Sequence, residues 1–442
     1  MNCYDRHYLK IALPAALEGL FMILLASTDL ILVGALGSLS VAAVSIFLQP
    51  RLILLCFSHS LASAVTLAAC NHAGSGDRER SADLLKKSLV IGALLMGVLH
   101  VLFFYFLEDI FLLMGASADY LPLAMEYGPM ALLAVYFTSL TLILQAVLLG
   151  YGDTSSIMKT NISGNLLNAC LSFVLIRGLG PVPAFGVAGA AFGTAAGTLF
   201  SLLYSYYLLE REGFFHGGRW MPDRAYFKKV GPLFASVLSE QGSERIGMVL
   251  FSRMAAGLGT VPFAVHSICM NICDVYYDFI MGFGKAGMVT AGQAVGRGSM
   301  ADWHHYRRTG LFWCLILSTA ACGITLAFAH PIFVFYSPDP SLLPLASVIM
   351  VFIAFVSYPE ALALWGAGIL RGSGQTAQVA AYSFVSITFL RPLVTAFFIY
   401  GLDMGLVGTW CALFLDQVIR ASCASFLVNR LAVKRGFLPD AA

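Results

Sequence analysis

Long apolar runs alternate with short polar and glycine-rich breaks along this chain. A helix needs about 20 apolar residues to cross the roughly 30 Å hydrocarbon core of a bilayer, and twelve runs reach about that length. They lie at 11–34, 42–70, 87–107, 122–148, 159–177, 187–209, 231–255, 262–293, 309–330, 343–370, 378–400 and 406–428. The pattern predicts an all-α integral membrane protein with twelve transmembrane helices.

The composition indicates that lipid, rather than water, surrounds most of this surface. Of the 442 residues, 59% are hydrophobic and only 11% are charged, whereas soluble domains are about one quarter charged. The net charge of +2 excludes a basic surface for nucleic acid. The ten cysteines stand singly, without CxxC pairs or zinc-type spacing, so we expect no cofactor and no structural metal.

Lysine and arginine are distributed unevenly between the predicted loops. With the N-terminus in the cytoplasm, the inner loops and tails hold 19 of these residues, and the outer loops hold two, Arg177 and Arg253. Because cytoplasmic loops are enriched in positive charge, we predict a multi-pass protein of the inner (plasma) membrane with both termini in the cytoplasm. No cleavable signal is expected, since the first apolar run is too long and lacks a cleavage site.

The two halves of the sequence form an internal repeat with an offset of 222 residues. The matching pairs are Ala35-Leu36-Gly37 with Gly257-Leu258-Gly259, Gly74-x-Gly76 with Gly296-x-Gly298, and Gly150-x-Gly152 with Gly372-x-Gly374. Six spans per half start both halves on the same side of the membrane, so the repeat is parallel. It predicts an N-terminal six-helix lobe at 1–210, a cytoplasmic linker at 211–230 and a C-terminal six-helix lobe at 231–442.

Carboxylates inside the predicted spans are the residues that indicate chemistry, because an ionised side chain in hydrocarbon persists mainly when it faces a cavity or a partner. They are Glu18, Asp29, Glu126, Glu240, Glu244, Asp274, Asp278, Glu360 and Asp416. Glu240 and Glu360 each lie about 15 Å from the inner end of their span, near the midplane of the second half. Asp29 lies toward the outer leaflet of the first half.

Intramembrane arginines offer a structural explanation for some of these acids. Glu244 stands beside Arg245, and Asp416 lies one turn before Arg420, so these two acids are expected to form structural ion pairs. Glu240, Glu360 and Asp29 are expected instead to bind a proton or another cation. A separate row of small residues, Gly189, Gly193 and Gly197, lines one face of the sixth span and predicts a close helix contact.

Several short motifs occur in a fixed order along the chain. They are Leu13-Pro14, Asp29, Val33-Gly34-Ala35-Leu36-Gly37, Gly150-Tyr151-Gly152-Asp153-Thr154, Gly186-Val187-Ala188-Gly189-Ala190-Ala191, Glu240-Gln241, Leu258-Gly259-Thr260, and Glu360 ahead of Leu370-Arg371-Gly372. In this order they resemble the MATE family, the multidrug and toxic compound extrusion transporters, from about residue 8 to 430. The resemblance implies a MATE-like fold and a transporter rather than an enzyme.

The resemblance also implies where cations bind. It assigns a first-lobe site to Asp29, Asn168 and Thr194, and a second-lobe site to Glu240 and Glu360 with Asn271. Counting back from Gly259 selects Glu244 instead of Glu240, and both stay open. The implied activity is antiport: amphipathic, cationic organic compounds leave in exchange for H⁺ or Na⁺ by alternating access. The lipid bilayer and small organic cations are the expected partners of a monomer, with no nucleic acid and no cofactor.

One position departs from the family pattern. Many members carry an aspartate four residues after the asparagine that matches Asn168, and this chain has Ser172 there. The first lobe would thus offer Na⁺ one carboxylate, Asp29, with neutral oxygens, whereas hard cations prefer more anionic oxygens. We therefore expect weak Na⁺ binding in the first lobe, with coupling through protonation of Asp29 or through Glu240 and Glu360.

Two other function classes stay open on the sequence alone. A flippase for polyprenyl-linked saccharides or lipids would need a cationic cleft, for which Arg51, Arg245, Lys285 and Arg391 are available. A membrane enzyme with an acid pair would need a nucleophile, metal or cofactor motif, and none accompanies the acids. The GxxxxGK[ST] signature of ATPases is also absent from the sequence, so transport would draw on an ion gradient or on an outside partner.

The predicted topology can be tested by labelling single cysteines introduced into a cysteine-free background. Cysteines at Asp119 and Asp339 should react with an impermeant reagent added outside intact cells. Cysteines at Asp77 and His304 should react only after the membrane is opened, because these residues lie in the predicted inner loops. Labelling of position 77 from outside would contradict the topology.

Overall fold

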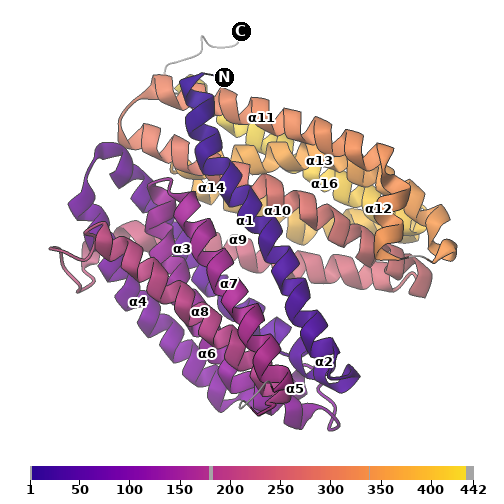
Figure 1. Cartoon of the computed structure of the whole chain (residues 1–442). Helices are drawn as coiled ribbons and strands as arrows, with labels where there is room; N and C mark the ends of the chain where they lie inside the picture. Colours follow the sequence, from indigo (N-terminus) through magenta and orange to yellow (C-terminus); the bar gives the residue numbers. More distant parts are fainter. Residues whose placement is uncertain (1, 179–182, 338, 435–442) are drawn as a thin grey trace. The chain divides into compact units, whose positions relative to one another are not determined.

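The computed structural model describes residues 2–178, 183–337 and 339–434, with the side chains of 24–31 and 434 excepted. Over these residues the chain is helical, with turns but no strand (Figure 1). The helices are α1 (Cys3–Gly34), α2 (Ser38–Ser45), α3 (Leu48–Ser75), α4 (Arg78–Tyr105), α5 (Leu107–Leu113), α6 (Leu121–Gly150), α7 (Thr154–Arg177), α8 (Gly186–Arg211), α9 (Arg224–Ala256), α10 (Thr260–Gly296), α11 (Met300–Ala327), α12 (Ala329–Tyr336), η1 (Pro340–Leu342), α13 (Leu343–Gly372), α14 (Thr376–Ser383), η2 (Phe384–Leu390), α15 (Arg391–Ala396), η3 (Phe397–Gly401) and α16 (Gly405–Lys434).

Every predicted span coincides with a helical segment, and several helices begin earlier than the apolar run. Helix α4 begins at Arg78 although its apolar run begins at 87, and its N-cap Asp77 accepts a hydrogen bond from the backbone N–H of Arg80. Asp153 caps α7 and Ser299 caps α11 in the same way. Capping side chains therefore set the helix starts within polar sequence that hydrophobicity does not recognise.

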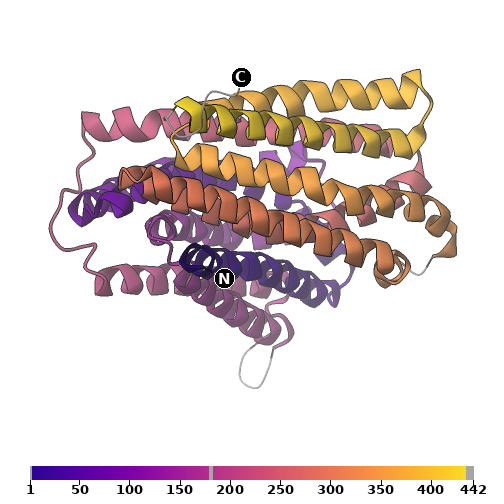
Figure 2. The same ribbon diagram turned by 90° about the horizontal axis from the view of Figure 1, so that it is seen from above.

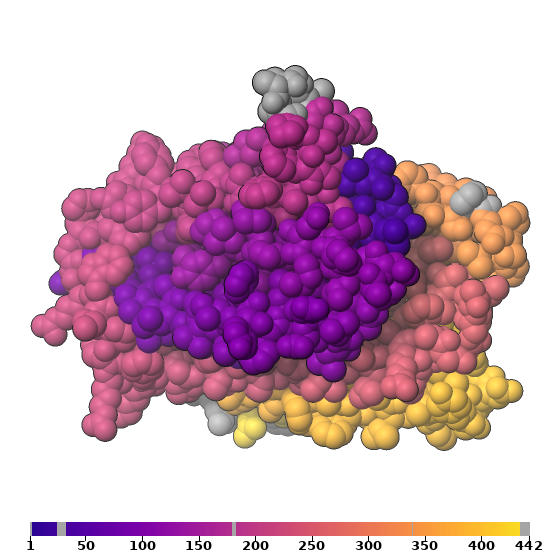
Figure 3. All heavy atoms as spheres, turned by 90° about the horizontal axis from the view of Figure 1, so that it is seen from below, coloured from indigo at the N-terminus to yellow at the C-terminus, as the bar shows by residue number. Residues whose placement is uncertain are grey.

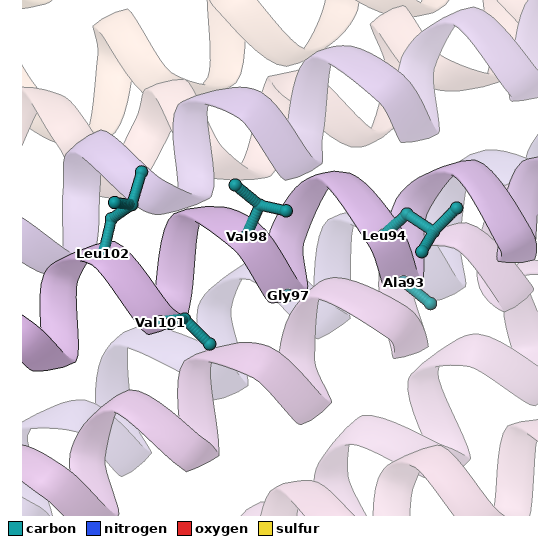
Figure 4. Close-up of a pocket in the computed structure, with 6 residues that line it drawn as sticks. All are labelled: Ala93, Leu94, Gly97, Val98, Val101 and Leu102. Atoms are coloured by element: carbon teal, nitrogen blue, oxygen red, sulfur yellow. The ribbon is translucent and has the colours of Figure 1, made fainter.

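The exposed faces of α4 and α11 are apolar, as expected of helices that contact lipid. Eight of the described helical segments are long and apolar enough to cross a membrane, including α4 and α11. On α4, Leu94, Val98 and Val101 are each at least 60% exposed and line a shallow apolar groove formed by this helix alone (Figure 4). The purple part of the chain, to which α4 belongs, presents a broad continuous surface (Figure 3). Side chains of α11 form a similar groove.

The internal repeat predicted from the sequence is present in the helix bounds. Helices α4 and α11 begin at 78 and 300 and end at 105 and 327, and α6 and α13 begin at 121 and 343, each a difference of 222 residues. The repeated glycines occupy the turns between helices. Gly76 and Gly298 both have φ near +70°, a left-handed conformation that glycine adopts without steric cost. The repeated sequence motifs are thus matching turns.

Packing follows the same repeat. In the first half α6 packs on α3, α4 and α8, and in the second half α13 packs on their counterparts α10, α11 and α16. The orange and yellow ribbons of α11, α13 and α16 run alongside one another in both views (Figures 1 and 2). The described residues thus form two sets of six long helical segments, α1 to α8 and α9 to α16, with shorter helices between them.

The chain divides into two compact units: Glu18–Phe234, and Met1–Leu17 with Ala235–Ala442. Helices α1 and α9 therefore each contribute to both units. The first turns of α1 pack on α10, where the Tyr8 hydroxyl donates a hydrogen bond to the Phe283 carbonyl at 2.6 Å. This division groups the first 17 residues with the second half, whereas the predicted bounds place them in the N-terminal lobe. The predicted lobe bounds stay a prediction.

The segment between α8 and α9 is anchored on α4 of its own unit. Arg78 forms an ion pair with Glu212 at 2.9 Å, and the backbone N–H of Arg219 donates to Asp83 at 2.8 Å. The Lys87 ammonium contacts Asp223 at 2.7 Å, and this hydrogen bond lowers the pKa of the Asp223 carboxyl. The predicted linker 211–230 is thus a folded segment, and its last residues already belong to α9.

The glycine row of α8 forms the close helix contact that the sequence predicted. A Cβ added at Gly189 would lie 2.7 Å from the backbone carbonyl carbon of Leu175 on α7, and one added at Gly193 would overlap Ser172. A Cβ added at Gly197 would likewise lie too close to the backbone oxygen of Gly164 on α7. The two helices approach this closely because α8 presents no side chain at these points.

Replacement of Gly189 by alanine should therefore destabilise the protein. The added Cβ meets backbone, which cannot rotate away, so overpacking should cost about 1–3 kcal/mol and lower the melting temperature in detergent. Gly97→Ala on α4 is the matched control, because nothing lies within 4 Å of its added Cβ. Equal melting temperatures for the two variants would contradict the assigned contact.

Candidate functional site

Three of the predicted first-lobe residues lie on the neighbouring helices α7 and α8. Asn168 and Ser172 are buried on α7, one turn apart, and the Ser172 hydroxyl donates to Asn168 Oδ1 at 3.0 Å. Thr194 on α8 donates its hydroxyl to the carbonyl of Ala190 at 2.9 Å. The structure thus joins Asn168 to Ser172. Asp29 lies in α1, but its side chain is outside the described residues, so its role stays a prediction.

Glu360 is the most deeply buried of the second-half acids that form no ion pair with a described residue. It follows Pro359 in α13, is 4% exposed, and its Oε2 atom is buried without a hydrogen-bond partner among the described residues. Asp274 of α10 and the two arginines Arg391 and Arg420 lie close enough to act on it electrostatically. A carboxylate in this position persists in hydrocarbon only if it can bind a proton or another cation.

Glu240 has a partner that the sequence analysis did not assign. Its carboxylate lies 2.6 Å from the guanidinium of Arg371, at the end of α13, and its side chain is 7% exposed. Arg371 belongs to the Leu370-Arg371-Gly372 motif. The ion pair neutralises Glu240 in this conformation, so a cation would have to compete with Arg371 for the carboxylate.

Asp416 is paired, but not with the expected arginine. Arg391 Nε donates to Asp416 Oδ2 at 3.0 Å, and Ser386 also donates to this carboxylate. The expected ion pair between Asp416 and Arg420, one turn further along α16, is therefore wrong. The partner of Asp416 is Arg391. Ser386 lies in η2, a π-helical stretch immediately before Arg391, and η2 and α15 both pack on α16. This local winding brings a distant arginine to Asp416.

The remaining predicted residues are not brought to Glu360 by any hydrogen bond or ion pair in the described part of the chain. Glu244 is half-buried, and Arg420 and Tyr277 lie within its electrostatic range. The structure shows no ion pair between Glu244 and the adjacent Arg245, which is exposed. Asn271 is exposed and donates to the carbonyl of Ser267 in its own helix at 2.8 Å.

Two acids in the predicted spans of the second half therefore form ion pairs with arginines, whereas Glu244, Asp274, Asp278 and Glu360 form none with any described residue. Arg371 and Arg391 each take one carboxylate, and Glu360 stays without a direct partner. Sequence reasoning treated the arginines as generic partners and did not assign Arg371. Its place in a repeated turn motif, eleven residues after Glu360, was the signal that could have identified it. No metal-binding cluster of His, Cys, Asp or Glu occurs among the residues that the structure describes.

Comparisons with known proteins bear on the family and the fold of the chain. The family model described as MatE matches residues 14–174 and 232–397. The chain is 25% identical to a probable multidrug resistance protein NorM of Rhizobium meliloti, with 97% of this chain and 93% of the relative covered. It is 24% identical to the multidrug resistance protein MdtK of Pectobacterium atrosepticum, with 95% and 93% covered. A crystal structure of a MATE P26A mutant shares the fold at a TM-score of 0.89 and 19% identity, with 98% of this chain and 97% of that chain covered.

The two buried acids should respond differently when each is replaced by glutamine. Glu240→Gln leaves the Arg371 charge uncompensated, so the melting temperature in detergent should fall by several degrees. Glu360→Gln removes a carboxylate that has no partner, and the protein should fold and melt as the unmodified protein does or at a higher temperature. A larger loss of stability in Glu360→Gln than in Glu240→Gln would show that the ion-pair assignment is wrong.

Proposed function

Because the chain belongs to the MatE family, we propose that it exports amphipathic, cationic organic compounds in exchange for H⁺ or Na⁺ by alternating access. Its relatives are named multidrug resistance proteins, and the matches cover nearly the whole of both chains. The proposal places the protein in the plasma membrane as a monomer with both termini in the cytoplasm. The 19 to 2 distribution of lysine and arginine between the predicted inner and outer loops supports that orientation.

The burial of Glu360 without a direct partner is the observation that carries this proposal. An antiporter needs a group that binds the ion or the cationic cargo but releases it again, and a carboxylate held permanently by an arginine is poorly suited to that. Glu360 is buried, lies mid-way along α13 and has no direct partner. A proton or an organic cation can therefore neutralise it in turn. Glu240 and Glu244 are the neighbouring acids of the proposed second-lobe site, with Asn271 at its edge.

The first lobe favours protons over Na⁺ in this proposal. Ser172 stands where a second carboxylate would supply an anionic oxygen, and its hydroxyl already donates to Asn168 Oδ1. Na⁺ would find one formal charge, Asp29, beside neutral oxygens of Asn168 and Thr194, and hard cations bind such sets weakly. A lone carboxylate can take up a proton without further ligands.

The flippase alternative is weaker in the light of the ion pairs. It depends on a cleft that presents free positive charge to a pyrophosphate group, and Arg391 was one of the four residues available for that purpose. Asp416 neutralises Arg391, and both side chains are almost completely buried, at 4% and 1% exposure. The multidrug relatives also favour export of small compounds over lipid transfer.

Transport in everted membrane vesicles, with a pH gradient and a sodium gradient imposed separately, tests the proposal. A fluorescent organic cation such as ethidium should accumulate when one of these gradients is imposed. Glu360→Gln should insert normally and abolish this accumulation, because the amide keeps the side-chain volume and loses the charge. Glu244→Gln should retain more activity, since an arginine lies within its electrostatic range. Reversed severity of the two variants would contradict the assignment of Glu360.

Sodium binding provides a second test. The unmodified protein should bind Na⁺ weakly in the first lobe, and Ser172→Asp should strengthen that binding by adding an anionic oxygen beside Asn168. Asp29→Asn should impair export with little change in Na⁺ affinity, measured by isothermal titration calorimetry. Tight Na⁺ binding in the unmodified protein that disappears in Asp29→Asn would contradict the proton preference.

A further inference from the structure

A polar network inside the first-lobe unit includes an acid that the proposed function does not use. Glu18 of α1 is half-buried, and its carboxylate accepts a hydrogen bond from Nδ2 of Asn161 on α7. Asn161 Oδ1 in turn accepts from Gln145 Nε2 on α6 at 2.8 Å. Gln145 Nε2 also lies 3.3 Å from the hydroxyl of the fully buried Ser205 on α8. Side chains from four helices thus converge beside one carboxylate.

The internal repeat relates Glu18 to Glu240. Their numbers differ by 222, the offset that relates the helix bounds of the two halves, so both acids occupy the same turn of equivalent helices. The neutralising residue is not repeated, however. The position equivalent to Arg371 is Leu149, and Glu18 forms no ion pair with any described residue. Its only hydrogen bond in the described structure comes from a neutral amide.

Polar residues connect the level of Glu18 to the level of Asp29. Glu18 and Asp29 are eleven residues apart in α1, close to three helical turns or about 16 Å along the helix. The same spacing recurs on α7, from Asn161 to Ser172, and on α8, from Thr194 to Ser205. The remaining polar members of these two rows are Asn165, Asn168, Thr198 and Ser201. The lobe thus contains a polar track within apolar helices.

We propose that Glu18 is a second proton-exchange residue of the first lobe, which passes protons between Asp29 and the cytoplasmic side along this track. The proposal rests on the proposed export function and adds a residue to its coupling path. The proton leaves one carboxylic acid for water, moves through water along the track and is bound by the other carboxylate, so proton and charge are conserved. The acid lies about 10 Å inside the predicted start of its span, nearer the cytoplasm than Asp29.

The network is better suited to a proton than to Na⁺. The amides of Gln145 and Asn161 face each other through two hydrogen bonds, of 2.8 and 3.3 Å, so their oxygens are already engaged. Sodium would find one carboxylate and amide oxygens that already accept hydrogen bonds, a weakly anionic set for a hard cation. A proton requires only the Glu18 carboxylate, and the donation from Asn161 holds that carboxylate in place until it arrives.

Few other titratable groups lie near this network. Helix α6 has none within a turn of Gln145; Lys159 precedes Asn161 by two residues on α7, and Tyr204 precedes Ser205 on α8. Lys159 is exposed, and the structure records no hydrogen bond or ion pair between either group and Glu18. The nearest acid on α1 itself is Asp29. A pH response that changes in a Glu18 variant is therefore attributable to this carboxylate.

The test compares purified protein in proteoliposomes with an imposed pH gradient, using ethidium as the probe. Glu18→Gln keeps an oxygen that can accept from Asn161, so the variant should fold and bind ethidium as the unmodified protein does. Its proton-driven export should fall to the level of empty liposomes. Glu126→Gln, an exposed acid on α6 of the same unit, should export normally. Normal proton-driven export by Glu18→Gln would overturn the proposal.

A second variant separates a proton-exchange role from a structural one. Asn161→Leu removes the hydrogen bond to Glu18 but keeps the carboxylate, so the ionised form loses support and the pH profile of export should move toward alkaline pH. An unchanged profile in this variant would overturn the proposal, as would export that responds to sodium gradients alone. If the unmodified protein exports ethidium under neither gradient, the proposed function itself is wrong. That result differs from the results that would overturn only the role of Glu18.

Discussion

The cost of an unpaired charge in hydrocarbon decides which acids of this chain are available for transport. Nine carboxylates lie in predicted spans, and burial of an ionised group without a partner is strongly unfavourable. Arg391 forms a buried ion pair with Asp416, and Arg371 forms a partly buried ion pair with Glu240. Glu360 in the second half and Glu18 in the first are among the acids that form no ion pair with a described residue. Ion exchange is possible where this pairing is incomplete.

The internal repeat gives the two halves the same helices but different chemistry. Matching turns and matching packing around α6 and α13 place Glu18 and Glu240 at equivalent points. In the second half an arginine occupies the position that is Leu149 in the first. The first half instead surrounds its acid with amides and hydroxyls. One scaffold thus supports an arginine-paired set of acids and a neutral polar track, which suits different roles in coupling.

The sequence predicted the parts of this structure that depend on local pattern. The twelve spans, the repeat and the contact of Gly189 with α7 follow from hydrophobicity, spacing and residue size, and the structure confirms them. The pairing of acids did not follow from pattern. Glu240 and Arg371 are 131 residues apart, and Asp416 meets Arg391 rather than its neighbour in the helix. Which arginine reaches which acid depends on how helices pack, and sequence spacing alone does not determine that.

Counting the protons released when a cationic compound binds tests the central claim, that an unpaired acid exchanges a proton for cargo, most directly. Purified protein in a weakly buffered detergent solution would be mixed with ethidium, and the change in pH recorded with an indicator dye. The unmodified protein should release protons on binding, and Glu360→Gln should release fewer, because the carboxyl that gives up its proton is gone. Equal release by both proteins would contradict the account.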